Sequence, residues 1–314
     1  MDINELYFSD NEENNPQPRV YRPRVNFDER FISDFQFREK FRLRRAEAEF
    51  IVEKIGQNLI NSEKNMALTP RQQLLVALHW LGCGSPYHCV ADMHGIGKST
   101  VCRIVRRVVD STIEIMFQDI VHWPDNTDDI AQEFLRIGGF PSVAGCVDGT
   151  LIKIDSPNIN EEQFVDRHGN HSLNCMNVCD RFDGGWRPFA DAVILGDSGY
   201  PLKSWLMTPM LDATNDIAEI RYNRCHKGTR RIVECAIGIV KERFPCLNMM
   251  RLQPVMAAKV VMACMTFHNI ASRDDFEYIL PNELPPIDRN PDLQLPYEPS
   301  GVARQQQLVN YFRY

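Results

Sequence analysis

Residues 143–154 read VAGCVDGTLIKI, two short apolar runs on either side of the pair Asp148-Gly149. Runs of this kind predict β-strands, and an Asp-Gly pair predicts a turn or a strand end. Further apolar runs, and then stretches in which apolar residues recur at helical spacing, follow at 173–179, 192–195, about 227–244 and about 257–272. Strands that alternate with helices predict an α/β domain, here over residues 139–275.

Two acidic residues of this domain come directly after predicted strands. The strand 143–147 leads into Asp148, and the strand 192–196 leads into Asp197. Side chains at strand ends leave the core and meet solvent, so acids on neighbouring strands would lie within a few ångströms of each other. Taken singly, each also has a simpler interpretation, because Asp-Gly and Gly-Asp-Ser-Gly sequences form turns.

A third carboxylate, Glu234, lies on the predicted helix 227–244. It belongs to a stripe spaced by three or four positions, which consists of His226, Arg230, Glu234, Gly238 and Lys241. Most of the remaining face is apolar and is predicted to point to the core through Ile232, Val233, Ala236, Ile239 and Val240. A surface glutamate paired with Arg230 is the alternative interpretation. Three carboxylates without histidine or thiolate partners suit Mg²⁺ or Mn²⁺ in a two-metal site for phosphodiesters.

Residues 41–138 predict a helical domain, because apolar residues recur there at helical spacing. Within it, residues 86–109 predict a short helix, a turn at Gly95-Ile96-Gly97 and a second helix. This is the layout of a helix-turn-helix, whose second helix presents basic side chains to DNA. The DNA-binding candidates on that helix are Arg103, Arg106 and Arg107. An ordinary helical hairpin with a solvated basic face is the alternative.

The two ends of the chain differ in composition from the domains between them. Residues 1–40 begin acidic, become rich in arginine and lack apolar periodicity, which predicts a flexible arm. Residues 276–314 predict a Pro-rich acidic tail that is mostly irregular, since six prolines stand between positions 281 and 300.

Composition excludes several classes of protein. The 314 residues carry a net charge of −7, which argues against a protein that coats nucleic acid by bulk positive charge. The N-terminus is acidic where a secretory signal begins basic, and the most apolar later stretch, 255–265, is interrupted by Lys259. Ten cysteines occur without a CxxC pair or a zinc-binding spacing. We expect a soluble, intracellular protein with reduced thiols and no membrane contact.

Five ordered motifs give the chain a specific resemblance to a known family. They are GCVDGT at 145–150, HSLN at 171–174, LGDSGYP at 195–201, the segment 222–244 around Glu234, and FHNI at 267–270. Over about residues 40–275 the chain resembles the PIF/Harbinger class of DDE transposases and the Harbinger transposase-derived nucleases. The resemblance implies an RNase H-like (DDE) catalytic domain after a helix-turn-helix region, with Asp148, Asp197 and Glu234 as the metal-binding catalytic triad. It also implies DNA as substrate, a divalent cation as cofactor and a separate Myb-like DNA-binding partner.

One departure from the family pattern concerns the sheet. Family members carry a further strand and a Pro-Gly-Ser…His-Asp segment between the positions of Asp180 and Asp197. Roughly two dozen of those residues, about one strand with its connections, are absent here. The catalytic domain is therefore expected to lack an edge strand, whereas the strands of Asp148 and Asp197 are expected to be neighbours.

Two functions fit these observations. The first is a metal-dependent nuclease of Harbinger origin that hydrolyses DNA phosphodiester bonds, with His226, Arg230 and Lys241 contacting phosphate or supporting Glu234. The second is a catalytically inactive, domesticated or decayed transposase that serves as a DNA- or protein-binding module. We expect action in the nucleus, and cytoplasmic residence stays open because no strong basic import cluster is present. The sequence is also compatible with a homo-oligomer.

Overall fold

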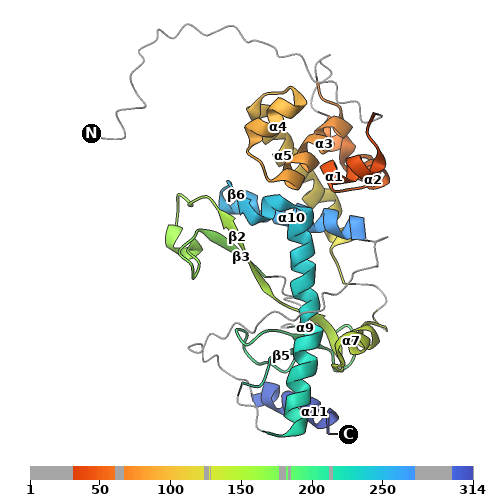
Figure 1. Cartoon of the computed structure of the whole chain (residues 1–314), viewed down its shortest axis with the longest axis vertical. Coiled ribbons are helices and arrows are strands. Elements are labelled where there is room, and N and C mark those ends of the chain that lie inside the picture. Colours follow the sequence, from red (N-terminus) through yellow and green to blue (C-terminus); the bar gives the residue numbers. More distant parts are fainter. Residues whose placement is uncertain are drawn as a thin grey trace, which may run out of the picture.

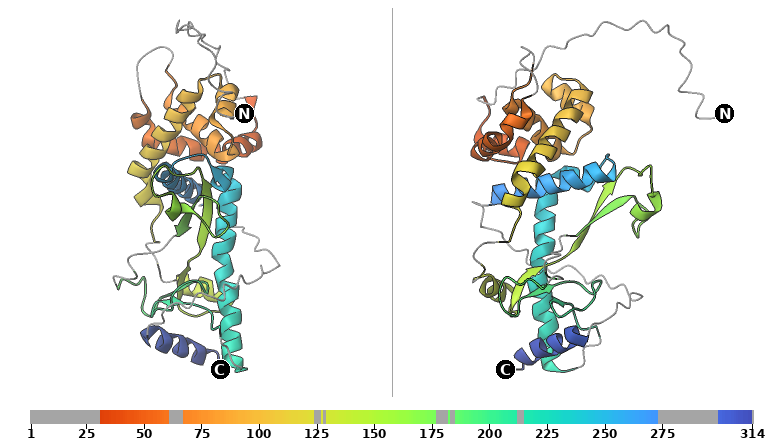
Figure 2. Two further views of the ribbon diagram at one scale, coloured as in Figure 1. Left: turned by 90° about the vertical axis from the view of Figure 1, so that its left-hand side faces the viewer. Right: turned by 180° about the vertical axis from the view of Figure 1, so that it is seen from behind.

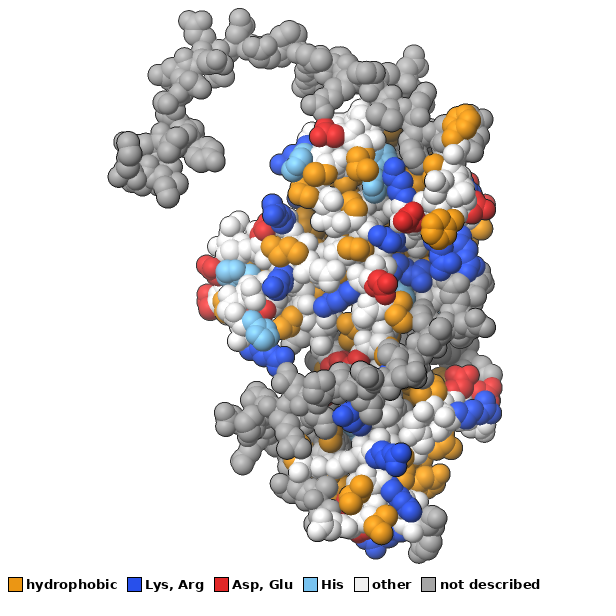
Figure 3. Space-filling view, viewed as in Figure 1, with side chains coloured by type: hydrophobic (Ala, Val, Ile, Leu, Met, Phe, Trp, Pro, Cys, Tyr) orange, Lys and Arg blue, Asp and Glu red, His pale blue; other side chains and the backbone are white. Residues whose placement is uncertain are grey.

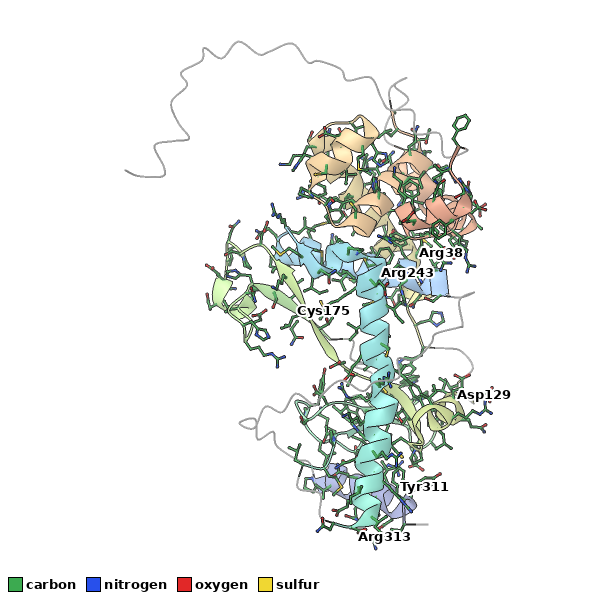
Figure 4. All side chains as sticks on the ribbon, viewed as in Figure 1. Arg38, Asp129, Cys175, Arg243, Tyr311 and Arg313 are labelled. Carbon is green, nitrogen blue, oxygen red and sulfur yellow. The ribbon has the colours of Figure 1, made fainter. Side chains whose placement is uncertain are left out.

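The computed structural model describes residues 31–60, 67–123, 127, 129–176, 182, 185–211, 215–272 and 299–313. Helix α9 (Ile217–Arg243) follows the long axis of the molecule, with helices α1 to α5 at one end and helix α11 (Pro299–Tyr311) at the other (Figure 1). Arg243 at one end of α9 and Arg313 beside its other end are labelled in Figure 4. Nη2 of Arg313 lies 3.3 Å from Oδ2 of Asp216, the N-cap residue of α9.

The helical body consists of α1 (Asp34–Phe41), α2 (Arg45–Leu59), α3 (Pro70–Cys83), α4 (Tyr87–His94) and α5 (Lys98–Thr112). Helix α5 continues through a π-helical turn (Ile113–Phe117) into α6 (Gln118–Ile120). Gly95 ends α4 with φ at 60°, a left-handed conformation that favours glycine. The predicted order of short helix, turn and second helix is therefore present over 87–112.

Helix α1 corrects the prediction of a flexible arm over residues 1–40. Phe37 and Phe41 stand one turn apart, so both rings face the same side of α1 and are fully buried. Ser33 caps the helix in a capping box with Gln36. The sequence pattern that indicates α1 consists of only two aromatic residues one turn apart. The arginines around them gave the segment the composition of a flexible arm. Residues 1–30 of the predicted arm lie outside the described residues.

In the described part of the chain, two three-stranded sheets lie beside α9. The first contains β1 (Val143–Cys146), β4 (Val193–Leu195) and β5 (Leu206–Met207), all parallel, in the order β1-β4-β5. In the second, β2 (Gly149–Ile154) is antiparallel to β3 (Ser172–Met176) and parallel to β6 (Met249–Met250). The predicted strands are confirmed over their described residues, whereas β5 and β6, with two residues each, are too short to show an alternating pattern.

Strands β1 and β2 follow each other with only Val147 and Asp148 between them. The chain therefore leaves the first sheet and enters the second at Asp148. Because β1 pairs with β4, the strands that precede Asp148 and Asp197 are neighbours, as predicted. The junction of Asp180 with Arg181, where the resemblance places the absent segment, lies outside the described residues.

Helix α7 (Ile130–Gly138) packs closely on α9. A Cβ atom at Gly138 would overlap both the side chain and the backbone of Thr229. Gly139 follows with φ at 75° and ends the helix. These two glycines mark the boundary predicted at residue 138, and the structure places them in a tight helix contact rather than in a loose linker.

The hydrophobic cores extend across that predicted boundary. The largest core joins the helical body to β2, β6 and α10 (Pro254–Ser272). A second core packs the sheet β1-β4-β5 against α9 and α11, and a third contains Phe182 and Trp205. Short 3-10 helices at Glu161–Phe164 and Pro245–Asn248 complete the described elements. The helical body and the β2–β3 layer thus form one packed unit, with the β2–β3 hairpin projecting from it (Figure 2).

Helix α10 is long and apolar enough to cross a membrane by length and composition alone. It packs against α5 and the π-helical turn, and its residues Ala257, Val260, Cys264 and Phe267 are fully buried. This is the environment of a core helix, and it confirms the helix predicted over 257–272.

Helix α11 differs from the irregular tail predicted over 276–314. Leu308 and Val309 are buried in the second core, and Gly301 lies against the backbone of Leu202, where a Cβ atom would come within 2.9 Å. The stretch with helical spacing is short, and the proline-rich residues before it dominate the composition of 276–314. Residues 273–298 lie outside the described residues.

Candidate active site

Asp148 is the first carboxylate of the candidate site. Its Oδ1 accepts the N–H of Gly149 at 3.0 Å and lies 3.4 Å from Nη1 of Arg230 on α9. Burial raises the pKa of Asp148, Arg230 opposes this effect, and the nearby charge of Asp197 adds to it. A partly buried carboxylate between a like charge and a cation is typical of functional sites.

Asp197 is brought to Asp148 by the parallel pairing of β1 with β4. The register pairs Cys146 with Leu195, so each aspartate follows a paired position by two residues. Both carboxylates therefore lie at the same end of neighbouring strands. Oδ1 of Asp197 accepts the N–H of Gly199 at 2.8 Å, which holds the side chain in the turn after β4.

Glu234 reaches the same neighbourhood through Arg230. On α9, Nη2 of Arg230 forms an ion pair with Glu234 one turn further along, which is the pairing expected from the alternative interpretation of Glu234 as a structural residue. Nη1 of the same guanidinium faces Asp148. The three side chains are only 16% (Arg230), 28% (Glu234) and 19% (Asp148) exposed. One arginine thus joins the carboxylate of the helix to the carboxylate of the strand junction.

His226 lies in the interior of the protein. It is 1% exposed, and its Nε2 donates a hydrogen bond to the carbonyl oxygen of Met207 at 3.0 Å, which ties α9 to β5. Burial lowers the pKa of His226 to about 4, so the ring is neutral at pH 7. A neutral, buried ring presents no charge to DNA, which argues against the predicted phosphate contact of His226 and leaves the other predicted role, support of Glu234.

Lys241 is also engaged by the protein. Its Nζ donates to the carbonyl oxygen of Leu151 at 3.1 Å and so ties α9 to β2. Burial lowers the pKa of Lys241. The predicted contact of Lys241 with phosphate would require this hydrogen bond to break.

The three arginines of α5 lie in the helical body and have different surroundings. Arg103 and Arg106 are exposed, and Nε of Arg103 donates to the carbonyl oxygen of Ser99 at 3.3 Å. Nη1 of Arg107 donates to Oε1 of the buried Gln73 at 2.6 Å. Arg107 therefore holds α5 on α3, and of the predicted set Arg103 and Arg106 present their charges to solvent.

Tyr200 is a neighbour of the carboxylates that the spacing arguments did not select. Burial raises the pKa of Tyr200 to about 12, with further increases from Asp197 and Asp148. Its ring packs on Gly196, where a Cβ atom would lie 3.0 Å from the ring. The phenol therefore stays protonated at pH 7 and is a hydrogen-bond donor at the edge of the site. The available signal was its place in the LGDSGYP motif, three residues after Asp197.

The donor set of this site fits a hard divalent cation. Asp148, Asp197 and Glu234 supply carboxylate oxygens, which are the ligands that Mg²⁺ and Mn²⁺ prefer. Within the described part of the chain, no three acidic, histidine or cysteine side chains are close enough together to hold an ion. The guanidinium of Arg230 lies between Asp148 and Glu234 instead.

Comparisons with known proteins identify the family of this chain. Residues 181–269 match a family described as DDE superfamily endonuclease; the matched range includes Asp197 and Glu234 and begins after Asp148. The Mus musculus protein named "Putative nuclease HARBI1" is 30% identical over 281 residues, covering 77% of this chain and 79% of the mouse protein. The Homo sapiens protein of the same name is 30% identical over 259 residues, covering 71% and 73%. "Protein ALP1-like" of Arabidopsis thaliana is 24% identical over 247 residues, covering 65% and 61%.

No solved structure matches the chain. The mixed α/β architecture is consistent with a DDE nuclease domain. The chain belongs to the Harbinger transposase-derived nucleases of the DDE endonuclease superfamily, which confirms the family predicted from its motifs.

Proposed function

We propose that this protein is a divalent-metal-dependent endonuclease that hydrolyses DNA phosphodiester bonds, with Asp148, Asp197 and Glu234 as its metal ligands. The observation that carries the proposal is that Asp148 neighbours Asp197 and shares the guanidinium of Arg230 with Glu234. The β1–β4 register brings Asp148 to Asp197, and Arg230 joins Asp148 to Glu234. The match to the DDE superfamily endonucleases supports the proposal of a nuclease.

Each side chain of the site has a part in this function. A bound Mg²⁺ or Mn²⁺ ion would supply activation of water and stabilisation of the leaving oxygen. His226 and Lys241 fix α9 against the two sheets and so place Glu234. Tyr200, protonated at pH 7, is available to donate a hydrogen bond to a substrate oxygen.

DNA binding is assigned to the helix-turn-helix formed by α4 and α5. Arg103 and Arg106 are exposed on the second helix of this pair, and Lys and Arg side chains are distributed over the helical body (Figure 3). With a net charge of −7, the chain is suited to work with a separate basic partner, for which a Myb-like DNA-binding protein is proposed. The proposed place of action is the nucleus, with residence in the cytoplasm as well.

A second candidate function is a catalytically inactive DNA- or protein-binding module. The alignment with the mouse relative extends over 281 positions but includes 77% of the 314 residues, so the relative carries residues that this chain lacks. This supports the absence of some of the family's residues from this chain. The proposed place of the loss, between Asp180 and Asp197, and the proposed loss of an edge strand rest on the motif pattern of the sequence. A module that only binds would have no need of a divalent ion.

Thermal unfolding with Mn²⁺ or with EDTA separates the two functions. In wild type, Mn²⁺ at a hundredfold excess over its dissociation constant should add about 2.7 kcal/mol to the free energy of unfolding and raise the melting temperature by several degrees. The Asp197→Asn variant should lose this shift and also any Mn²⁺-dependent nicking of plasmid DNA. The matched control is Asp119→Asn, which makes the same chemical change at an exposed aspartate of α6. A cooperative transition without a metal shift in wild type would contradict the nuclease and favour the module.

A further inference from the structure

Arg230 lies between two carboxylates of the candidate site. Its Nη2 pairs with Glu234, and its Nη1 lies 3.4 Å from Oδ1 of Asp148. Nη1 is buried and, within the described part of the chain, makes no hydrogen bond. An unsatisfied buried donor costs free energy. Charge attraction, rather than a complete set of hydrogen bonds, therefore holds the guanidinium in place.

We propose that Arg230 competes with the divalent cation for Asp148 and Glu234 and has to leave them before the ion binds. The inference rests on the proposed function, because it concerns the same carboxylates. Ionised carboxylates that share a site repel each other, and a cation between them relieves this repulsion. A divalent ion would relieve it in the same way, and it would be repelled by a guanidinium that stayed within a few ångströms.

DNA offers the displaced guanidinium a new partner. Guanidinium groups bind phosphate in a bidentate, charge-assisted manner, and the resulting pair is stronger than a neutral hydrogen bond. A phosphodiester at the site would hold Arg230 away from the carboxylates and leave their oxygens to the ion. Binding of DNA and binding of the ion should therefore strengthen each other.

The test measures Mn²⁺ affinity of the full chain by titration calorimetry, with the metal-dependent rise in melting temperature as a second reading. Arg230→Gln should bind Mn²⁺ about tenfold more tightly than wild type, or better, because a unit positive charge is removed from the site. Arg230→Lys should bind more tightly by a smaller factor, since lysine keeps the charge but cannot span two carboxylates. The control Arg224→Gln removes the same charge from an exposed position of α9 and should match wild type.

The outcomes distinguish this inference from the proposed function. Mn²⁺ binding that depends on Asp197 in wild type, but is equal or weaker in Arg230→Gln, would overturn the competition and leave the proposed function standing. If the glutamine variant does not fold, equal or weaker binding by Arg230→Lys would overturn it in the same way. No Mn²⁺ binding in wild type or in any folded variant would reject the proposed function and the competition together. A short DNA duplex should tighten Mn²⁺ binding by wild type and not by Arg230→Gln, and an equal effect on both would overturn the coupling.

Discussion

Helices α5 and α9 both carry arginines at helical spacing, and the structure places these arginines in opposite surroundings. On α5, Arg103 and Arg106 are exposed to solvent. On α9, Arg230 is 16% exposed and paired with acids from its own helix and from the β1–β2 junction. The two sequences offer the same local pattern. The difference shows that a basic stripe presents its charges to solvent only where no other element packs on it.

The largest expected effect comes from disturbing the placement of α9. Gly138→Ala should lower the free energy of unfolding by about 3 kcal/mol or more, because the added methyl group overlaps the backbone of Thr229, which cannot move aside alone. Gly238→Ala, on an open part of the same helix with no neighbour within 4 Å, should raise it by about 0.5–1 kcal/mol. Urea unfolding of both variants measures the contrast. Similar effects of the two substitutions would show that the contact between α7 and α9 is not a tight one.

The next effect concerns the buried histidine of α9. The pKa of His226 is about 4 in the folded protein against 6.5 for an exposed ring, so the unfolded chain binds the proton first. Its contribution to stability is therefore complete above about pH 6.5 and is lost as the pH falls towards 4, to a total of about 3 kcal/mol.

Urea unfolding between pH 7 and pH 4 measures this dependence. His226→Gln should be less stable than wild type at pH 7 and should lose less stability with acid. His88→Gln, at an exposed position of α4, should retain the full dependence on pH. An unchanged slope in His226→Gln would show that the ring is not held neutral in the core.

The smallest expected effect on stability concerns Arg106 and Arg107 of α5. Arg107→Ala should cost about 1–2 kcal/mol of stability, because Oε1 of the buried Gln73 loses its donor. Arg106→Ala should change stability by less than about 0.5 kcal/mol. If α5 is the recognition helix, the Arg106 variant should also reduce the slope of log affinity for duplex DNA against log salt by about one. An unchanged slope together with unchanged affinity would remove Arg106 from the DNA interface.

Local patterns predicted most of the elements. Apolar runs located β1 to β4, and helical spacing located α10 and the C-terminal end of α9 to within a few residues. The prediction missed the start of α9, which begins at Ile217 and not near residue 227. The same patterns misjudged the two ends of the chain, where Phe37 and Phe41 in α1, and Leu308 in α11, join cores built from distant segments. Composition describes a segment on average, whereas a few buried side chains are enough to anchor it.

The buried face of α9 also differs from the face predicted by helical spacing. Helical spacing predicted that Ile232, Val233, Ala236, Ile239 and Val240 would face the core, and of these Val240 is buried. The residues buried in the first half of α9 are Ala218, Tyr222, His226 and Thr229, which pack on α7, β5 and the second core. Periodicity defines the faces of a helix, but the elements that pack on it at each end decide which face is covered.

The sequence alone predicted that Asp148 and Asp197 stand at strand ends and that Glu234 stands four residues after Arg230 on a helix. Its motifs also identified the chain as a relative of the Harbinger-type nucleases, which the comparisons confirm. These features depend on local spacing and on the order of motifs, which can be recognised in a single sequence. Three further contacts are visible only in the tertiary structure: the ion pair of Arg230 with Asp148, the hydrogen bond of the buried His226 to β5 and the hydrogen bond of Lys241 to β2. The reason is physical: each of these contacts joins segments far apart in sequence, and its charge or hydrogen bond takes effect only when packing brings them together and excludes water.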